Sequence, residues 1–212
     1  MTNESVGQAQ LVALAPLLVA RGVAMRFGRE EEIYGQGEDA AFLYKVISGV
    51  VRTCAFVANG RRLIEGFYLP GDLFGLEQDN VHTFCAEAVS DVEIAVVPRA
   101  AVARAADSDR AAALALWRLT TEKLASANQH LMILGKKTAA ERVAAFLLHF
   151  ADRCGARDVN LPMSRTDIAD YLGLTIETVS RTFSKLERAR AISLDGARQV
   201  TFNNVAQLQA AA

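Results

Sequence analysis

The stretch from Met163 to Ala191 constrains the fold of this chain more than any other part of the sequence. Ser164 can cap a first helix, and Asp167 follows three residues later, a spacing close to that of a capping box. Gly173 readily adopts positive φ and is placed to end that helix. Thr175 can cap a second helix, so the stretch predicts two helices joined by a tight turn. The inner face of the first helix is expected to carry Ile168, Ala169 and Leu172.

The second predicted helix has two different faces at helical spacing. Its apolar side consists of Val179, Phe183 and Leu186. Its polar side consists of Glu177, Ser180, Arg181, Ser184, Lys185 and Arg188. A solvated amphipathic helix would show the same two stripes. The glycine turn, the short first helix and the polar cluster in the first turn together favour a recognition helix for DNA.

The polar residues of that helix have the chemistry needed to recognise base edges. Arg181 can donate two hydrogen bonds to guanine O6 and N7, and Glu177 can accept from cytosine N4. Ser180 can bond either kind of edge. Contacts to phosphates position a protein on DNA without specifying the base sequence. Polar residues at the starts of the two helices, and basic residues beyond the first turn of the second helix, are expected to make such contacts. The expected contacts to the DNA backbone are Ser164, Thr175, Thr178, Lys185, Arg188 and Arg198.

A predicted β-hairpin follows the two helices. Residues 192–194 and 200–202 alternate like strands, and Asp195-Gly196 between them is a signal for a two-residue turn. A helix-turn-helix followed by a hairpin is a winged helix. Arg198 would then lie on the wing, where it could contact a phosphate.

The residues from about Phe27 to Pro98 have a different texture, in which glycines punctuate short runs of Val, Ile, Phe and Tyr. This spacing predicts a small antiparallel roll or sandwich. The expected strands are 33–34, 42–47, 50–57, 63–69, 84–89 and 92–97, with a hairpin turn at Asn59-Gly60. Residues 1–25 are expected to contain a short helix around 8–20.

The sequence becomes helical and Ala-rich after Pro98, with helices expected at 99–106 and 109–134. Six residues of the longer helix follow a heptad, with Asn128 at a position that can specify a paired register. We therefore predict a parallel dimer seam, which suits a DNA reader that binds two half-sites. Packing of the helix on its own sheet is the alternative. The predicted seam is Leu114, Trp117, Thr121, Leu124, Asn128 and Leu131.

Gly135 is expected to end the long helix, and Thr138 with Glu141 forms a capping box for a helix reaching about Asp152. Residues 153–160 are expected to be a polar loop. The predicted fold class is therefore α+β. It comprises an antiparallel β-roll sensor-like domain (1–108), a dimerisation helix (109–135) and a C-terminal winged helix-turn-helix DNA-binding domain (136–212).

Composition excludes several classes of protein. The formal net charge is -1, but residues 136–212 carry 11 Lys and Arg against 8 Asp and Glu, a net of +3, while residues 1–135 carry 12 against 16. No secretory signal or membrane-spanning run is apparent, so a cytoplasmic protein without membrane contact is expected. The three cysteines are widely spaced, which favours reduced thiols over a disulfide framework or a zinc site. An enzyme on the roll would need converging ligands, but His82, His130 and His149 are scattered.

Several motifs together resemble the CRP/FNR transcription regulators, across residues 27–202. These motifs are 35–38 (GQGE), 43–49 (LYKVISG), 70–75 (PGDLFG), 136–142 (KKTAAER) and 167–175 (DIADYLGLT). The Glu-x-x-Ser-Arg pattern from Glu177 to Arg181 resembles the FNR and FixK branch. The resemblance implies a roll like that of cyclic-nucleotide-binding domains and a homodimeric activator that binds double-stranded DNA at TTGA…TCAA palindromes. It also implies contact with RNA polymerase through residues 153–160 and the Asn59-Gly60 hairpin.

Departures from the family pattern bear on cofactors. FNR holds an iron–sulfur cluster with N-terminal cysteines, but residues 1–53 contain no Cys, and a cluster needs about four thiolates. The cyclic-nucleotide branch binds phosphate with an Arg that follows the Gly-Asp-Leu segment. Here Glu77 to His82 follow that segment, and no Arg occurs between it and Arg99. Some relatives bind haem, but a lone His82 is more often structural. A FixK-like regulator without cofactor is expected.

Two alternatives remain for the function. One is a ligand-gated or haem-gated sensor regulator of the same family. The other is a sensor that has lost DNA binding, against which the intact set of Glu177, Ser180 and Arg181 argues.

Overall fold

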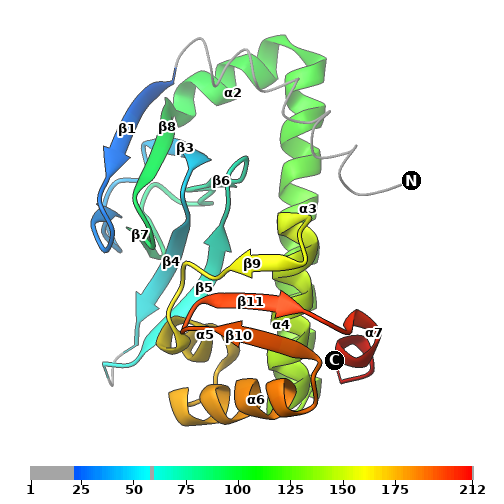
Figure 1. Cartoon of the computed structure of the whole chain (residues 1–212). Helices are drawn as coiled ribbons and strands as arrows, with labels where there is room; N and C mark the ends of the chain where they lie inside the picture. Colours follow the sequence, from blue (N-terminus) through cyan, green and yellow to red (C-terminus); the bar gives the residue numbers. More distant parts are fainter. Residues whose placement is uncertain (1–21, 58–59, 212) are drawn as a thin grey trace. The chain divides into compact units, whose positions relative to one another are not determined.

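The computed structural model describes residues 22–57 and 60–211 (Figure 1). The chain forms two compact units whose boundary falls within one helix, between Ser126 and Ala127. The helix predicted around residues 8–20 and the Asn59 half of the predicted hairpin turn lie outside the described residues.

The N-terminal unit contains an antiparallel β-roll, as predicted. Its strands form two four-stranded sheets, in the orders β1-β8-β3-β6 and β2-β7-β4-β5. The strands are β1 (Val23–Phe27), β2 (Glu32–Tyr34), β3 (Phe42–Ser48), β4 (Val51–Phe56), β5 (Arg62–Tyr68), β6 (Leu73–Phe74), β7 (Cys85–Ala88) and β8 (Val92–Pro98).

Inward-facing side chains of both sheets form the core of the roll. On β8, Val92, Ile94 and Val96 alternate along one face, as the two-residue period of a strand requires. They pack in one cluster with aromatic residues such as Tyr34 and Phe74. Burial of this cluster from both sheets holds the roll together.

Sequence patterns missed two strands of the roll. Strand β1 pairs with β8 over its whole length, but its side chains are mostly exposed and lack an alternating pattern. Strand β6 has only two residues and follows the Pro70-Gly71 corner. Both strands form because they pair with a neighbouring strand, and the local sequence has no alternation of apolar and polar residues that would predict them.

Helices α2 (Arg99–Ser108) and α3 (Arg110–Lys136) follow the roll. Small residues let α3 approach it, because Ala112 and Ala115 are buried there. The prediction that Gly135 ends the helix is wrong, since the helix continues to Lys136. A glycine within a helix costs only about 1 kcal/mol, which neighbouring turns can offset.

The C-terminal unit is a winged helix-turn-helix, also as predicted. Helix α4 (Ala139–Cys154) starts with both hydrogen bonds of the Thr138–Glu141 capping box. The remaining elements are β9 (Asp158–Asn160), α5 (Arg165–Leu172), α6 (Ile176–Arg188), β10 (Ile192–Asp195), β11 (Gln199–Phe202) and α7 (Val205–Ala211). In Figure 1 the hairpin of β10 and β11 lies beside α6.

Three details of this unit differ from the sequence predictions. Residues 158–160 are not loop but strand β9, which pairs with β11. The hairpin turn is longer than two residues, because Asp195 pairs with Gln199. Gly196, the first residue of this turn, has a φ of 67°, in the left-handed region that favours glycine. Helix α7 was not predicted, and its buried Leu208 anchors it.

Candidate nucleic-acid interface

Local hydrogen bonds fix the start of each helix in the helix-turn-helix. The backbone N–H of Asp167 donates to Ser164 Oγ at 3.0 Å, and the Ser164 N–H donates to the Asp167 carboxylate at 2.8 Å. Gly173 ends α5 with a φ of 61°. The Thr178 N–H then donates to Thr175 Oγ1 at 3.3 Å and starts α6. The predicted caps and turn are therefore confirmed.

The apolar side of α6 is buried as predicted, and it includes contacts that the sequence did not reveal. Val179, Phe183 and Leu186 are buried. Thr182 is buried beside them, and its hydroxyl donates to the Thr178 carbonyl at 2.8 Å. The Arg165 guanidinium carbon lies 3.3 Å from the centre of the Phe183 ring, a cation–π contact. Burial lowers the pKa of Arg165 to about 10, so the guanidinium remains charged at neutral pH.

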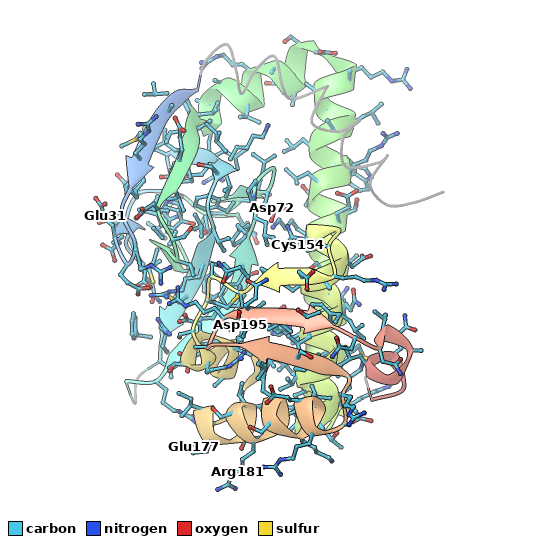
Figure 2. All side chains as sticks on the ribbon, viewed as in Figure 1. Glu31, Asp72, Cys154, Glu177, Arg181 and Asp195 are labelled. Carbon is cyan, nitrogen blue, oxygen red and sulfur yellow. The ribbon has the colours of Figure 1, made fainter. Side chains whose placement is uncertain are left out.

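The polar side of α6 faces away from this core. Glu177, Ser180 and Arg181 are all exposed, as are Lys185 and Arg188. Figure 2 shows Glu177 and Arg181 projecting away from the helix ribbon. The pKa of Glu177 is lowered by hydrogen bonds from its own backbone N–H and from Thr175, and by the Arg181 charge. An ionised Glu177 accepts hydrogen bonds but donates none.

The other residues predicted to contact DNA occupy different positions. Ser164 and Thr175 stand at the N-caps of α5 and α6, where their hydroxyls already accept backbone hydrogen bonds. Thr178 is half-buried, and its hydroxyl lies 3.1 Å from that of Thr175. Arg198 lies in the turn between β10 and β11 and is half-buried. The structure thus gathers Glu177, Ser180, Arg181, Lys185 and Arg188 on one helix face, with Arg198 apart from them on the wing.

Arg142 is an organising residue that the sequence did not single out. Its guanidinium donates to the carbonyls of Leu134 at 2.7 Å, Lys137 at 2.9 Å and Leu172 at 3.1 Å. These carbonyls belong to the last turns of α3 and α5 and to the α3–α4 connection. Carbonyls at helix ends lack partners within the helix. Arg142 therefore joins the recognition module to the end of α3.

The predicted seam residues of α3 form an exposed stripe. Trp117 is 68% exposed and Leu131 is 65% exposed. Thr121 and Asn128 lie between the apolar members and are exposed as well. Large apolar side chains gathered on an exposed face usually mark an interaction surface. The exposed apolar members of the stripe are Leu114, Trp117, Leu124 and Leu131.

The β-roll contains a cavity of about 140 Å³. Two carboxylates line it, and Glu65 accepts hydrogen bonds from Thr53 at 2.6 Å and from Tyr68 at 2.9 Å. Lys123 of α3 also lines it, with its ammonium 4.0 Å from the centre of the Tyr68 ring. The cavity is lined by Tyr34, Thr53, Glu65, Tyr68, Leu73, Phe74, Gly75, Leu76, Glu77, Phe84 and Lys123.

Two basic residues near this cavity already have structural partners. His82 is buried and stacks on Tyr34 with ring centres 3.6 Å apart, while its Nδ1 lies 3.4 Å from Glu77 Oε1. The Arg99 guanidinium donates to the backbone carbonyls of Ala40 and Asp79, both at 2.9 Å, and to that of Glu77. The predicted scatter of histidines is also seen, since His130 instead stacks on Tyr171 in the other unit.

Comparisons with known proteins agree with this architecture. Residues 24–109 match the model of the cyclic nucleotide-binding domain, and residues 141–211 match the Crp-like helix-turn-helix domain. The chain is 46% identical to the nitrogen fixation regulation protein FixK of Azorhizobium caulinodans over 213 residues, covering 98% of this chain and 84% of the relative. It is 39% identical to the transcriptional activatory protein AadR of Rhodopseudomonas palustris, covering 82% and 76%.

A solved structure extends the agreement to three dimensions. The structure of FixK2 from Bradyrhizobium japonicum matches with a TM-score of 0.87 and 43% identity, over 90% of this chain and 96% of that one. Fold and helix surface define a DNA-binding transcription regulator with a winged helix-turn-helix. The chain belongs to the CRP/FNR family and is FixK-like. This family consists of regulators and not of enzymes. Among the described residues, no helix combines the length and apolar character needed to cross a membrane.

Proposed function

We propose that the chain is a homodimeric transcription activator that binds TTGA…TCAA palindromes. The exposed row of Glu177, Ser180 and Arg181 in the first turns of α6 carries this proposal. Arg181 would read the guanine of each half-site and Glu177 the opposing cytosine, with Ser180 beside them. Ser164, Thr175, Thr178, Lys185, Arg188 and Arg198 would contact the backbone.

The exposed stripe on α3 supports pairing of two chains. Leucines alternate with Thr121 and Asn128 at heptad spacing, which suits a parallel two-helix seam. A symmetric dimer presents two recognition helices, one for each half of a palindrome. The name of the relative AadR, a transcriptional activatory protein, supports activation and hence contact with RNA polymerase.

We propose further that DNA binding needs no cofactor. The roll cavity carries Glu65 and Glu77, which would repel a phosphate, and among the described residues that line it only Lys123 is cationic. Arg99 already donates to three carbonyls, so a cyclic nucleotide does not fit. His82 is stacked within the core, which disfavours haem ligation. Three cysteines are fewer than the roughly four thiolates of an iron–sulfur cluster.

A ligand-gated regulator is the second candidate, and the cavity in the roll is the observation that favours it. Its aromatic walls and two carboxylates suit an uncharged or cationic molecule better than an anion. Such a regulator would bind its operator weakly until the molecule is supplied.

Operator binding by the full chain in aerobic buffer tests the proposal. Gel-shift titration without added nucleotide should give a complex of two chains per TTGA…TCAA palindrome. Changing the guanine in both half-sites should weaken binding at least tenfold, because each mismatch costs about 1–3 kcal/mol. A requirement for cyclic AMP, haem or anaerobic iron would contradict the cofactor-free proposal. A complex with one chain per palindrome would contradict the dimer.

A further inference from the structure

Two cysteines that are far apart in the sequence meet inside the β-roll. Cys54 on β4 lies directly opposite Cys85 on β7 in the antiparallel register. Their Sγ atoms are 2.8 Å apart, and Cys85 Sγ also lies 3.0 Å from the Cys54 carbonyl oxygen. Cys54 is 0% exposed and Cys85 is 3% exposed. Sheet register brings the two thiols together, so no spacing motif reveals the pair.

The backbone at this pair is compatible with a covalent bond between the sulfurs. Directly opposed residues of antiparallel strands have Cα atoms about 4.5 or 5.5 Å apart. Disulfides accept Cα separations of about 4.4–6.8 Å, and their sulfurs are about 2.05 Å apart. Starting from 2.8 Å, the sulfurs need to approach by less than about 1 Å. Side-chain rotation can supply this movement without any slip of the strands.

A metal ion is a poorer occupant of this cluster. The Glu87 carboxylate is the third potential ligand, and all three ligand atoms lie within 4.8 Å of one another. However, Glu87 is held by Arg52 at 2.7 Å, and Arg62 lies 3.9 Å away. Two thiolates on one tetrahedral zinc ion would be about 3.8 Å apart, because each Zn–S bond is about 2.3 Å long. The observed sulfur contact is much shorter than that.

We propose that Cys54 and Cys85 form a reversible dithiol–disulfide couple that a hydroperoxide oxidises. In the first step, one sulfur attacks the peroxide, an S–O bond forms and the O–O bond breaks. The departing oxygen takes the thiol proton and leaves as water or as an alcohol. In the second step, the other thiol attacks the sulfenic sulfur, so that the S–S bond forms and the S–O bond breaks. The hydroxyl group takes the second thiol proton and leaves as water.

The electron count of this reaction is complete. The two thiols lose two electrons in forming the disulfide, and the peroxide gains the same two electrons. Burial raises the pKa of the Cys54 thiol, so little thiolate exists at neutral pH and oxidation is slow. The couple therefore responds to sustained rather than brief exposure to peroxide.

The position of the pair links it to the cavity of the roll. Thr53 and Phe84, the neighbours of the two cysteines in sequence, both line that cavity. A disulfide would tie β4 to β7 at this wall and close a long loop of the chain. Closing such a loop stabilises the folded state chiefly by restricting the unfolded chain.

Thiol labelling of the full chain tests the couple directly. The Cys154→Ser variant retains only the buried pair, which removes competition from the exposed thiol. This variant is reduced, treated with hydrogen peroxide, and then unfolded in guanidinium in the presence of N-ethylmaleimide. Mass spectrometry gives the mass of the chain. We expect an unlabelled chain lighter than the reduced chain by two hydrogen atoms. Dithiothreitol should restore two labels per chain.

A matched variant and a second readout decide between the outcomes. The double variant Cys54→Ala, Cys154→Ser keeps only Cys85, so it cannot form the intramolecular disulfide. For the natural sequence, oxidation should raise the unfolding temperature of the roll by roughly 5–10 °C. Retention of both labels after prolonged oxidation, or addition of oxygen atoms without loss of hydrogen, would overturn the proposal. Co-purified zinc that protects both thiols from labelling would overturn it too.

Discussion

Helices α3 and α6 expose opposite kinds of surface. The exposed stripe of α3 is built on Trp117, Leu124 and Leu131, whereas α6 exposes Glu177 and Arg181. Burial of apolar surface stabilises a complex by about 25 cal/mol per Å², and this contribution has no preferred direction. Charged and polar groups contribute less net free energy, because water already hydrates them. Their hydrogen bonds are directional, however, and can discriminate between bases. Helix α3 is therefore suited to the pairing of two chains proposed above, and α6 is suited to bind a polyanion.

The strongest test of this comparison places charge in the α3 stripe. Leu124→Glu with Leu131→Glu would put unpaired carboxylates into an apolar seam, where burial of charge is costly. We expect sedimentation to show monomers and operator affinity to fall by roughly 10²-fold or more. Ser126→Glu with Gln129→Glu adds the same charge at exposed positions off the stripe and should leave the dimer intact. An unchanged dimer in the first variant would place the seam elsewhere.

An effect confined to one base pair of each half-site is expected when the arginine proposed to read bases is removed. Arg181→Ala should cost about 1–3 kcal/mol per half-site and flatten the preference at one base pair. Binding to operators with single symmetric substitutions measures this preference. Glu177→Ala should relax discrimination at the cytosine instead. Full retention of the guanine preference by Arg181→Ala would show that another residue reads that base.

Substitutions at the N-cap of α5 separate an effect on folding from an effect on DNA contact. Ser164→Ala should lower the free energy of unfolding by about 1 kcal/mol, because the Asp167 N–H loses its acceptor. Ser164→Gly should cost only a few tenths of a kcal/mol. Both variants remove the hydroxyl proposed to contact a phosphate, so their DNA affinities should fall equally once folding is complete. Urea unfolding gives the free energy of unfolding of each variant. A Ser164→Ala variant as stable as the natural sequence would refute the capping role.

The smallest effect is expected further along α6. Lys185→Ala should weaken binding to all sequences alike and lower the slope of log K against log salt by about one unit. Titrations at several salt concentrations measure the slope. Arg104→Ala, which removes an exposed cation from α2, is the control and should leave the slope unchanged. A change in sequence preference for Lys185→Ala would mean that this residue reads bases.

Sequence predicted best those features that depend on neighbours within a few residues. The caps at Ser164 and Thr138 each pair with a carboxylate three residues later, so their signal is local. The polar face of α6 follows from helical period alone. Strand β9 escaped prediction because its three residues have no period and it exists by pairing with β11.

Features that depend on distant residues could not be read from spacing. The contact between Cys54 and Cys85 depends on the register of two strands, and three isolated thiols were expected instead. The stacking of Arg165 on Phe183 joins two helices through a charged side chain that no sequence pattern singled out. Residue type therefore indicates the chemistry that we propose for the interface, whereas tertiary packing decides which charged groups remain exposed.

The three hydrogen bonds of Arg142 decide where a stand-alone DNA-reading fragment should begin. A fragment cut at residue 136 would lack the Leu134 carbonyl, which accepts the shortest of these bonds. The half-buried guanidinium would then lose a partner that water replaces poorly. A fragment beginning at Ala127 retains the last turns of α3 and all three acceptors. The final turns of α3 must therefore be kept when this winged helix is excised, transplanted or fused to another protein.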